Sequence, residues 1–221
     1  MTTLAAELRS AIEQWAEGLR RDSRLLGLAK AGKLPSRAFA LYLESLRYLF
    51  RSSQQNLACA ALAARRVQHE ELAEYFERKA REEHGHDRWA KRDLAALPAA
   101  VGRELQPAPA IEELVALQRS LIDRHPLLML VYALWAEYFT VLLGDEWLDA
   151  LARSGYPREQ VTAIAKHLDA DRQHAALGFA EVDRLWHGQP ERAQLVECVQ
   201  RAGCVFVRFC DEIWSEAQRA A

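Results

Sequence analysis

The stretch HLDADRQH at residues 167–174 is the most informative part of this chain for its fold and function. It lies within a longer segment, 157–186, that has the composition of one helix. At about 100° per residue, the side chains of His167, Asp171 and His174 leave such a helix along one narrow stripe. Buried ionisable groups need partners, so this stripe is a poor way to fill a core. It is a good way to hold a metal ion, and we predict that these three residues are metal ligands.

A second candidate pair of ligands lies in the segment 70–97, which also has the composition of a helix. Glu83 and His86 are three positions apart, which places them about 60° apart around a helix axis. The pattern Glu-x-x-His on one helix, with ligands from other helices, is typical of di-iron and di-manganese carboxylate proteins. His84 competes with His86, because only one of the two can face inward. We favour His86, and the role of His84 stays open.

Two further glutamates stand alone in apolar segments of the sequence. Glu137 lies in LVYALWAEYFTV at 130–141, and Glu44 lies in AFALYLESL at 38–46. An isolated buried glutamate has to pair, become protonated or bind a metal, because a bare buried charge is costly. We predict that Glu137 is a ligand, whereas an ion pair would explain Glu44 equally well. The predicted ligands are Glu83, His86, Glu137, His167, Asp171 and His174.

The donor types in this set indicate iron or manganese. Carboxylates and imidazoles without thiolates suit these metals, whereas structural zinc sites favour cysteines and closed tetrahedra. Six donors exceed what one catalytic zinc ion requires, and they match two ions that share carboxylates. A two-metal centre with open coordination positions can bind and reduce dioxygen. We therefore expect two iron ions, with manganese as an alternative, and dioxygen as a co-substrate.

The composition is that of an ordinary globular protein, and we expect a single domain over residues 1–221. Half of the residues are hydrophobic, and the net charge of −2 gives no support to nucleic-acid binding. No apolar run reaches the length of a membrane span, since the nearest one, 127–143, is short and contains Glu137. The start of the chain does not resemble a signal peptide, so we expect reduced cysteines and a cytoplasmic location.

Nearly the whole chain is predicted to be helical, because Ala, Leu, Glu and Arg dominate and glycine is scarce. Prolines and glycines mark the breaks, and residues 98–109 are predicted to form a surface loop. The fold class is therefore an all-α bundle of seven to eight helices. The predicted helices span about 3–20, 22–32, 37–66, 70–97, 110–125, 127–153, 157–186 and 191–221.

Three parts of the sequence together resemble a known family. They are EEHGHDRWAKRDL at 82–94, the segment 126–137 with its Tyr132 and Glu137, and the ligand stripe at 167–174. In order and spacing they are similar to the heme-oxygenase-like diiron oxidases and oxygenases, over about residues 36–187. The resemblance implies a seven-helix heme-oxygenase-like bundle in which core helices carry the six predicted ligands.

The resemblance also implies an activity. Proteins of this family use dioxygen to oxidise small organic substrates, by N-oxygenation of an amine or by oxidative cleavage of a C–C bond. We therefore expect a non-heme iron oxidoreductase with a small-molecule substrate and no nucleic-acid or membrane partner. An external electron donor and a homodimer are both compatible with this interpretation.

The same fold houses other activities, so the fold alone does not decide among them. A heme oxygenase would need a histidine in its first helix, and this chain has none before His69. Thiaminase-II-like members use a cysteine in the region that matches 130–143, where this chain has none. A metal-independent enzyme of the thiaminase-II or pyrroloquinoline-quinone-synthase type is one alternative. A non-catalytic helical scaffold is another.

Overall fold

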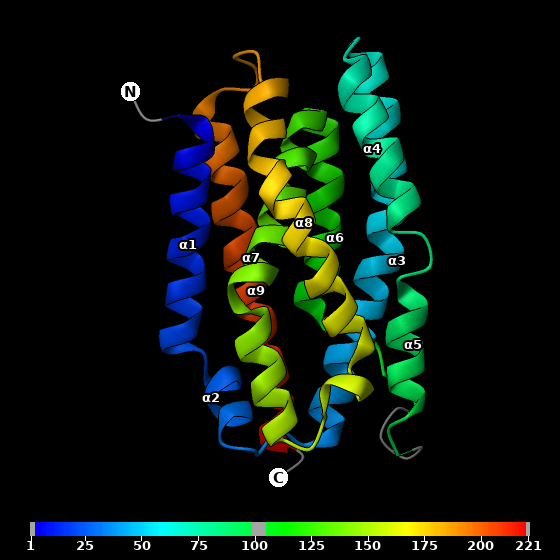
Figure 1. Ribbon diagram of the computed structural model, residues 1–221, viewed down its shortest axis with the longest axis vertical. Coiled ribbons are helices and arrows are strands. Elements are labelled where there is room, and N and C mark those ends of the chain that lie inside the picture. The colour runs from blue at the N-terminus through cyan, green and yellow to red at the C-terminus, as the bar shows by residue number, and fades with distance from the viewer. Residues whose placement is uncertain (1–2, 99–104, 220–221) are drawn as a thin grey trace.

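The computed structural model describes residues 3–98 and 105–219, which form a bundle of long helices that run side by side (Figure 1). The predicted all-α fold is therefore confirmed. A short 3-10 turn, η1, spans Arg158–Gln160. The helices are α1 (Leu4–Asp22), α2 (Arg24–Lys30), α3 (Ser36–Arg66), α4 (Glu70–Glu82), α5 (Asp87–Ala95), α6 (Pro109–Arg124), α7 (Pro126–Arg153), α8 (Thr162–Leu185) and α9 (Arg192–Arg219).

Caps and prolines start several helices where the sequence predicts a boundary. The hydroxyl of Thr3 accepts a hydrogen bond from the Ala6 N–H at 3.2 Å, which satisfies an otherwise free donor at the start of α1. Pro109 and Pro126 open α6 and α7. Proline suits this position because its missing N–H would have no partner within the helix.

Helix α7 is the core of the bundle. Its sequence is apolar around nearly its whole circumference, and such a pattern predicts burial on all sides. It packs against α1, α2, α3, α6, α8 and α9. Among the described helices it alone is long and apolar enough to cross a membrane, which the sequence of 127–143 did not lead us to expect. Within the bundle, 61% of that apolar window is buried, so α7 acts here as a core helix.

One predicted helix is wrong, because residues 70–97 form two helices. Helix α4 ends at Glu82, α5 begins at Asp87, and a turn at 83–86 separates them. Gly85 in this turn has a φ of 84°, a left-handed conformation that glycine adopts without a steric penalty. The predicted surface loop at 98–109 lies partly outside the described residues, at 99–104.

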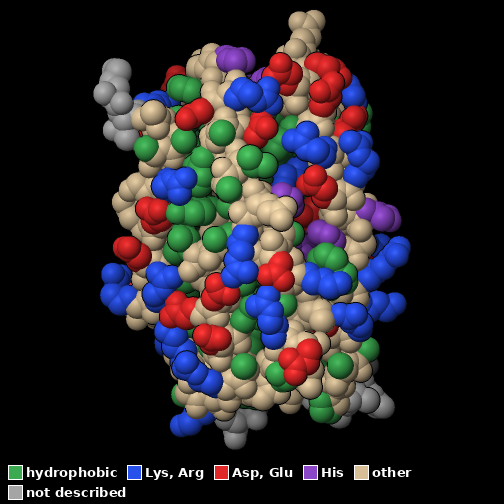
Figure 2. Space-filling model, in the orientation of Figure 1, with side chains coloured by type: hydrophobic (Ala, Val, Ile, Leu, Met, Phe, Trp, Pro, Cys, Tyr) green, Lys and Arg blue, Asp and Glu red, His purple; other side chains and the backbone are tan. Residues whose placement is uncertain are grey.

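The face seen in Figure 2 carries acidic and basic side chains that are mixed with one another. No large patch of one sign dominates this view, in keeping with a net charge of −2. Histidine side chains reach the surface between α8 and the α4–α5 segment. Two of the segments predicted to carry ligands therefore meet at this place.

Candidate metal centre

The six predicted ligands lie in two clusters, and members of both clusters line the same interior cavity. In each cluster, one donor atom from every residue lies within 4.8 Å of the others. Helix α8 contributes to both clusters, α7 contributes to one, and the turn between α4 and α5 contributes to the other. The first cluster is Glu83, His86 and His167, and the second cluster is Glu137, Asp171 and His174.

The first cluster is compact. Oε2 of Glu83 lies 3.0 Å from Nδ1 of His86 and 3.5 Å from Nε2 of His167. The two imidazole nitrogens are 3.2 Å apart. Donor atoms that share one ion at about 2.1 Å lie roughly 3.0 to 3.4 Å from one another. The spacing of the first cluster therefore fits a single metal ion.

Neighbouring groups orient the two imidazoles of the first cluster. Nδ1 of His167 lies 3.1 Å from the carbonyl oxygen of Ala163, to which its N–H can donate. Such a bond leaves Nε2 free to bind a metal, as in most metal-ligating histidines. The ring of Phe50 stacks on His167 and that of Trp89 stacks on His86, each with a centroid distance of 4.0 Å.

The second cluster is wider and contains unpaired atoms. Nδ1 of His174 lies 3.7 Å from Oε1 of Glu137 and 3.9 Å from Oδ1 of Asp171. Among the described residues, the buried atoms Oε2 of Glu137 and Nδ1 of His174 have no hydrogen-bond partner. Buried polar atoms without a partner are rare in proteins, and a metal ion bound between these two atoms would satisfy both. The donor set of the second cluster therefore fits a metal, after a small contraction.

Lys79 lies against the second cluster, and we did not predict it. Its side chain is buried, and its Nζ lies 2.7 Å from Oε1 of Glu137 and 3.6 Å from Oε2 of Glu82. Lys79 occupies the apolar face of α4, in helical register with Leu72 and Phe76. The sequence did contain a signal that could have identified Lys79, namely a lysine at a core position of an amphipathic helix.

Burial and crowding of acids change the protonation of the second cluster. Burial, followed by the charges of Glu137 and Glu83, raises the pKa of Asp171 to about 9. Burial also raises the pKa of Glu137, although Lys79 opposes this shift. For His174, burial and the nearby charge of Lys79 lower the pKa, so its imidazole is neutral at neutral pH and suited to bind a metal.

Glu83 in the first cluster behaves in the opposite way. Burial works against its ionisation, but hydrogen bonds from His167 and His86 outweigh this effect and hold the pKa of the Glu83 carboxyl well below its usual range. Glu83 is therefore a carboxylate at neutral pH. The carboxyl group of the first cluster is therefore ionised without a metal, whereas the Asp171 carboxyl of the second cluster would have to lose a proton to bind one.

The two residues whose roles the sequence left open lie outside both clusters. His84 is exposed, and its Nδ1 lies 2.7 Å from Nε2 of Gln54. Glu44 accepts two hydrogen bonds from Arg47, at 2.5 and 2.7 Å. The ion pair that we considered for Glu44 is therefore present, and His86 rather than His84 faces His167.

Asp93 is a further residue that we did not predict, and it joins α5 to the start of α8. Its buried carboxylate accepts a hydrogen bond from the Ala163 N–H at 2.7 Å and another from the Thr162 hydroxyl at 2.5 Å. Free N–H groups at the start of a helix need such partners. Asp93 thereby ties the helix that carries His167 to the segment that follows His86.

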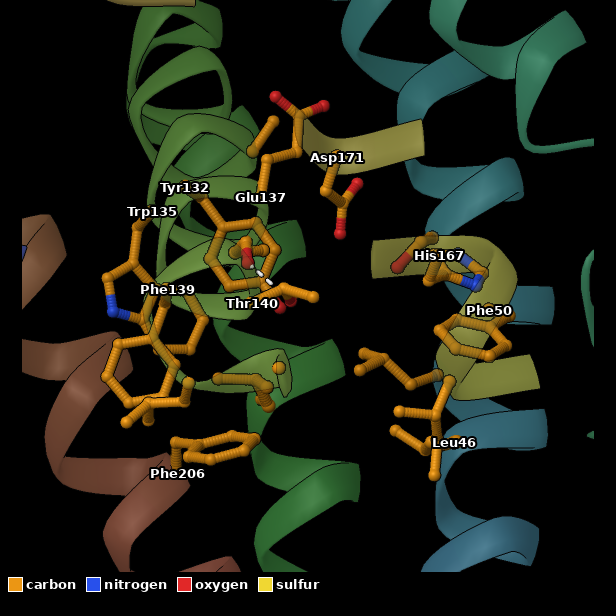
Figure 3. A pocket seen from close by; sticks show the side chains of 18 of the residues that line it. Leu46, Phe50, Tyr132, Trp135, Glu137, Phe139, Thr140, His167, Asp171 and Phe206 are labelled. Carbon is orange, nitrogen blue, oxygen red and sulfur yellow. Dashed lines mark hydrogen bonds between the residues drawn. The ribbon is translucent and has the colours of Figure 1, made fainter. Parts of the chain in front are cut away.

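The cavity beside the clusters has a volume of about 220 Å³. A single water molecule needs only about 10–15 Å³ on the same measure, so the cavity has room for a small organic molecule. Figure 3 shows Glu137, Asp171 and His167 on one side of it and the rings of Phe139 and Phe206 on the other.

Comparison with protein-family models and with curated proteins finds no match. Two of the solved structures that resemble the chain show its fold. One is a domain of unknown function with a heme oxygenase-like fold from Shewanella denitrificans, with 20% identity and a TM-score of 0.83 over 99% of this chain and 94% of that one. The other is a CADD-like protein of unknown function from Nostoc punctiforme, with 15% identity and a TM-score of 0.69 over 96% of this chain and 98% of that one. The chain therefore has the heme oxygenase-like fold.

Proposed function

We propose that this protein is a non-heme diiron oxygenase or oxidase, which uses dioxygen to oxidise a small organic substrate. The observation that carries the proposal is the pair of carboxylate and imidazole clusters beside one cavity. Each cluster offers three carboxylate or imidazole donors of the kinds that iron and manganese prefer. In this proposal one iron is held by Glu83, His86 and His167, and the other by Glu137, Asp171 and His174.

The chain's own residues would prepare the site for this chemistry. Two irons bound here would supply the electrons and open coordination positions that dioxygen reduction requires. Asp171 is protonated in the metal-free protein, and it would release this proton to solvent on binding a metal. Phe50 covers one face of His167 and, with the apolar lining of the cavity, keeps water away from the reacting groups.

The type of oxidation follows the resemblance described above. We propose N-oxygenation of an amine or oxidative cleavage of a C–C bond, with an external electron donor where the reaction needs one. The four cysteines are free, which agrees with the proposed cytoplasmic location. A metal-independent enzyme of the same fold and a helical scaffold are the alternatives that the experiment has to separate from this proposal.

The test is to load the protein anaerobically with ferrous iron and to measure both bound iron and dioxygen uptake. We expect about two irons per chain, a Mössbauer signal of a coupled pair, and dioxygen uptake in the presence of a reductant. His174→Ala should lose one iron and the dioxygen uptake, with unchanged helical circular dichroism. His84→Ala removes an exposed imidazole outside the clusters and should behave like the wild type. If the protein binds no iron, the proposal is wrong and the alternatives are favoured.

A further inference from the structure

We infer that the substrate is an amphiphile with one polar group, which lies at the metal clusters, and a hydrocarbon body that fills the rest of the cavity. The position of the polar group rests on the proposed function. The hydrocarbon body does not, because it is argued from the cavity lining alone. The inference excludes substrates that carry charges at opposite ends, such as α,ω-diamines and ω-amino acids.

The cavity is polar on one side only. Glu137, Asp171 and His167 lie together, and Phe139 and Phe206 face them across the space (Figure 3). The rest of the lining is mostly aliphatic and aromatic, and it comes from α1, α2, α3, α6, α7, α8 and α9. A ligand in this cavity therefore meets charge at one end and hydrocarbon along its remaining length.

All the charged residues of the lining lie at the polar end of the cavity. They are Lys79 and the acids Glu83, Glu137 and Asp171, and no arginine of the described chain lines the cavity. Lys79 is hydrogen-bonded to Glu137. A second charge on the substrate would therefore lie among apolar side chains without a partner, and the burial of an unpaired charge is strongly unfavourable.

The polar groups outside the charged end are neutral. Burial raises the pKa values of Tyr42 and Tyr132, so both phenols stay protonated at neutral pH. The indole N–H groups of Trp135 and Trp147 are buried and have no hydrogen-bond partner among the described residues. These groups can donate to an uncharged oxygen on the body of a substrate, but they cannot neutralise a second charge.

The test uses a series of linear alcohols, from butan-1-ol to decan-1-ol, with the metal-free protein. Binding is followed by tryptophan fluorescence, because Trp135 and Trp147 line the cavity, and by calorimetry. Each buried methylene group contributes about 0.8 kcal/mol, so the affinity should rise about fourfold per carbon until the cavity is full. Octane-1,8-diamine and 8-aminooctanoic acid, which carry charges at opposite ends, should bind at least tenfold more weakly than octan-1-ol.

Three variants locate the binding. Ala133→Phe fills the cavity from α7 and should weaken the binding of octan-1-ol at least tenfold. Ala58→Phe makes the same change on an exposed position of α3 and should have no effect. Phe206→Ala enlarges the cavity, so the rise in affinity should continue to longer alcohols than in the wild type.

Affinity that does not depend on chain length would overturn the inference, as would equal effects of Ala133→Phe and Ala58→Phe. Tight binding of the diamine or of the amino acid would overturn it as well. Because the titrations use metal-free protein, a failure of iron loading leaves this result intact. Iron loading without alcohol binding would instead leave the proposed function standing and remove the inference about its substrate.

Discussion

Lys79 adds a positively charged group to the second cluster. Its ammonium group is 2.7 Å from Oε1 of Glu137, so it competes with a metal ion for that carboxylate. The first cluster has no cationic side chain within this distance among the described contacts, and its donors are also closer together. We therefore expect the two clusters to bind metal with unequal affinity, with the first cluster filling before the second.

Replacement of Lys79 tests this expectation. In Lys79→Met the competing charge is removed and Glu137 is left without its partner, so a divalent ion should bind the second cluster about tenfold more tightly, a change of about 1.4 kcal/mol. The affinity of the first cluster should stay the same. Calorimetric titration with Mn²⁺ resolves the two steps, and Lys91→Met on the exposed side of α5 is the matched control. Unchanged second-step affinity would contradict the assigned role.

Asp171 makes the stability of the metal-free protein depend on pH. Its pKa is about 9 in the folded state and near its ordinary value of 3.8 in the unfolded state. Between these values the folded state binds the extra proton, so the contribution of Asp171 to stability is largest at low pH and is lost as the pH rises toward 9. Ionisation of Asp171 beside Glu137 and Glu83 is the physical cause of the loss.

An amide at this position removes that dependence. Metal-free Asp171→Asn should be more stable than the wild type by on the order of 2 kcal/mol at neutral pH, and the difference should grow between pH 5 and pH 9. Urea unfolding in the presence of a chelator measures it. Asp149→Asn makes the same change on an exposed position of α7 and should show no such trend. A constant or opposite difference would show that Asp171 is not the titrating group.

At the scale of the elements, the turn between α4 and α5 shows where prediction from the sequence stops. The residues around Gly85 have acceptable helix propensity, and a single glycine does not by itself end a helix. Where one helix ends and the next begins also depends on how α4 and α5 pack against α3. That packing involves residues far away in the sequence. Glu83 and His86 nevertheless remain neighbours. The N–H of His86 donates to the Glu83 carbonyl at 3.3 Å, so the turn also brings positions three apart together.

Gly85→Ala tests the turn directly. An added Cβ would meet only ordinary contacts with the Arg88 side chain, so the penalty comes from the positive φ of 84°. We expect a loss of about 1 kcal/mol in the free energy of unfolding, together with weaker metal binding at the first cluster. Gly27→Ala in α2 is the matched control, since that glycine is helical and has open space around its missing side chain. Equal effects of both variants on metal binding would contradict a role for the turn.

At the scale of the whole molecule, composition predicts a single all-α bundle, and the uniform hydrophobicity of α7 predicts its central position. Periodicity also predicts the stripe of candidate ligands on α8, because residues 167, 171 and 174 lie in register on one helix. Periodicity does not show which helices pack against each other, because the apolar face of a helix does not specify its partner. Lys79 and Asp93 were missed for this reason, because their roles depend on Glu137 and on the start of α8.

Metal binding should stabilise the entire bundle, because each cluster joins α8 to another part of the chain. At a free metal concentration a hundred times the dissociation constant, each occupied site adds about 2.7 kcal/mol to the free energy of unfolding. Thermal unfolding with Mn²⁺ and with a chelator measures this gain. Glu137→Gln should keep the part that belongs to the first cluster. No change in the unfolding temperature would show that neither cluster holds a metal.

The stacking of Trp89 on His86 has a consequence for how this protein can be studied. With the two rings 4.0 Å apart, a paramagnetic ion held by His86 would lie close enough to the indole to quench its emission. Metal binding to the first cluster can therefore be followed by tryptophan fluorescence, without a label or a substrate. Comparison with Trp89→Phe separates this signal from the emission of the other tryptophans. Trp89 is therefore an intrinsic fluorescent probe of metal occupancy at the first cluster.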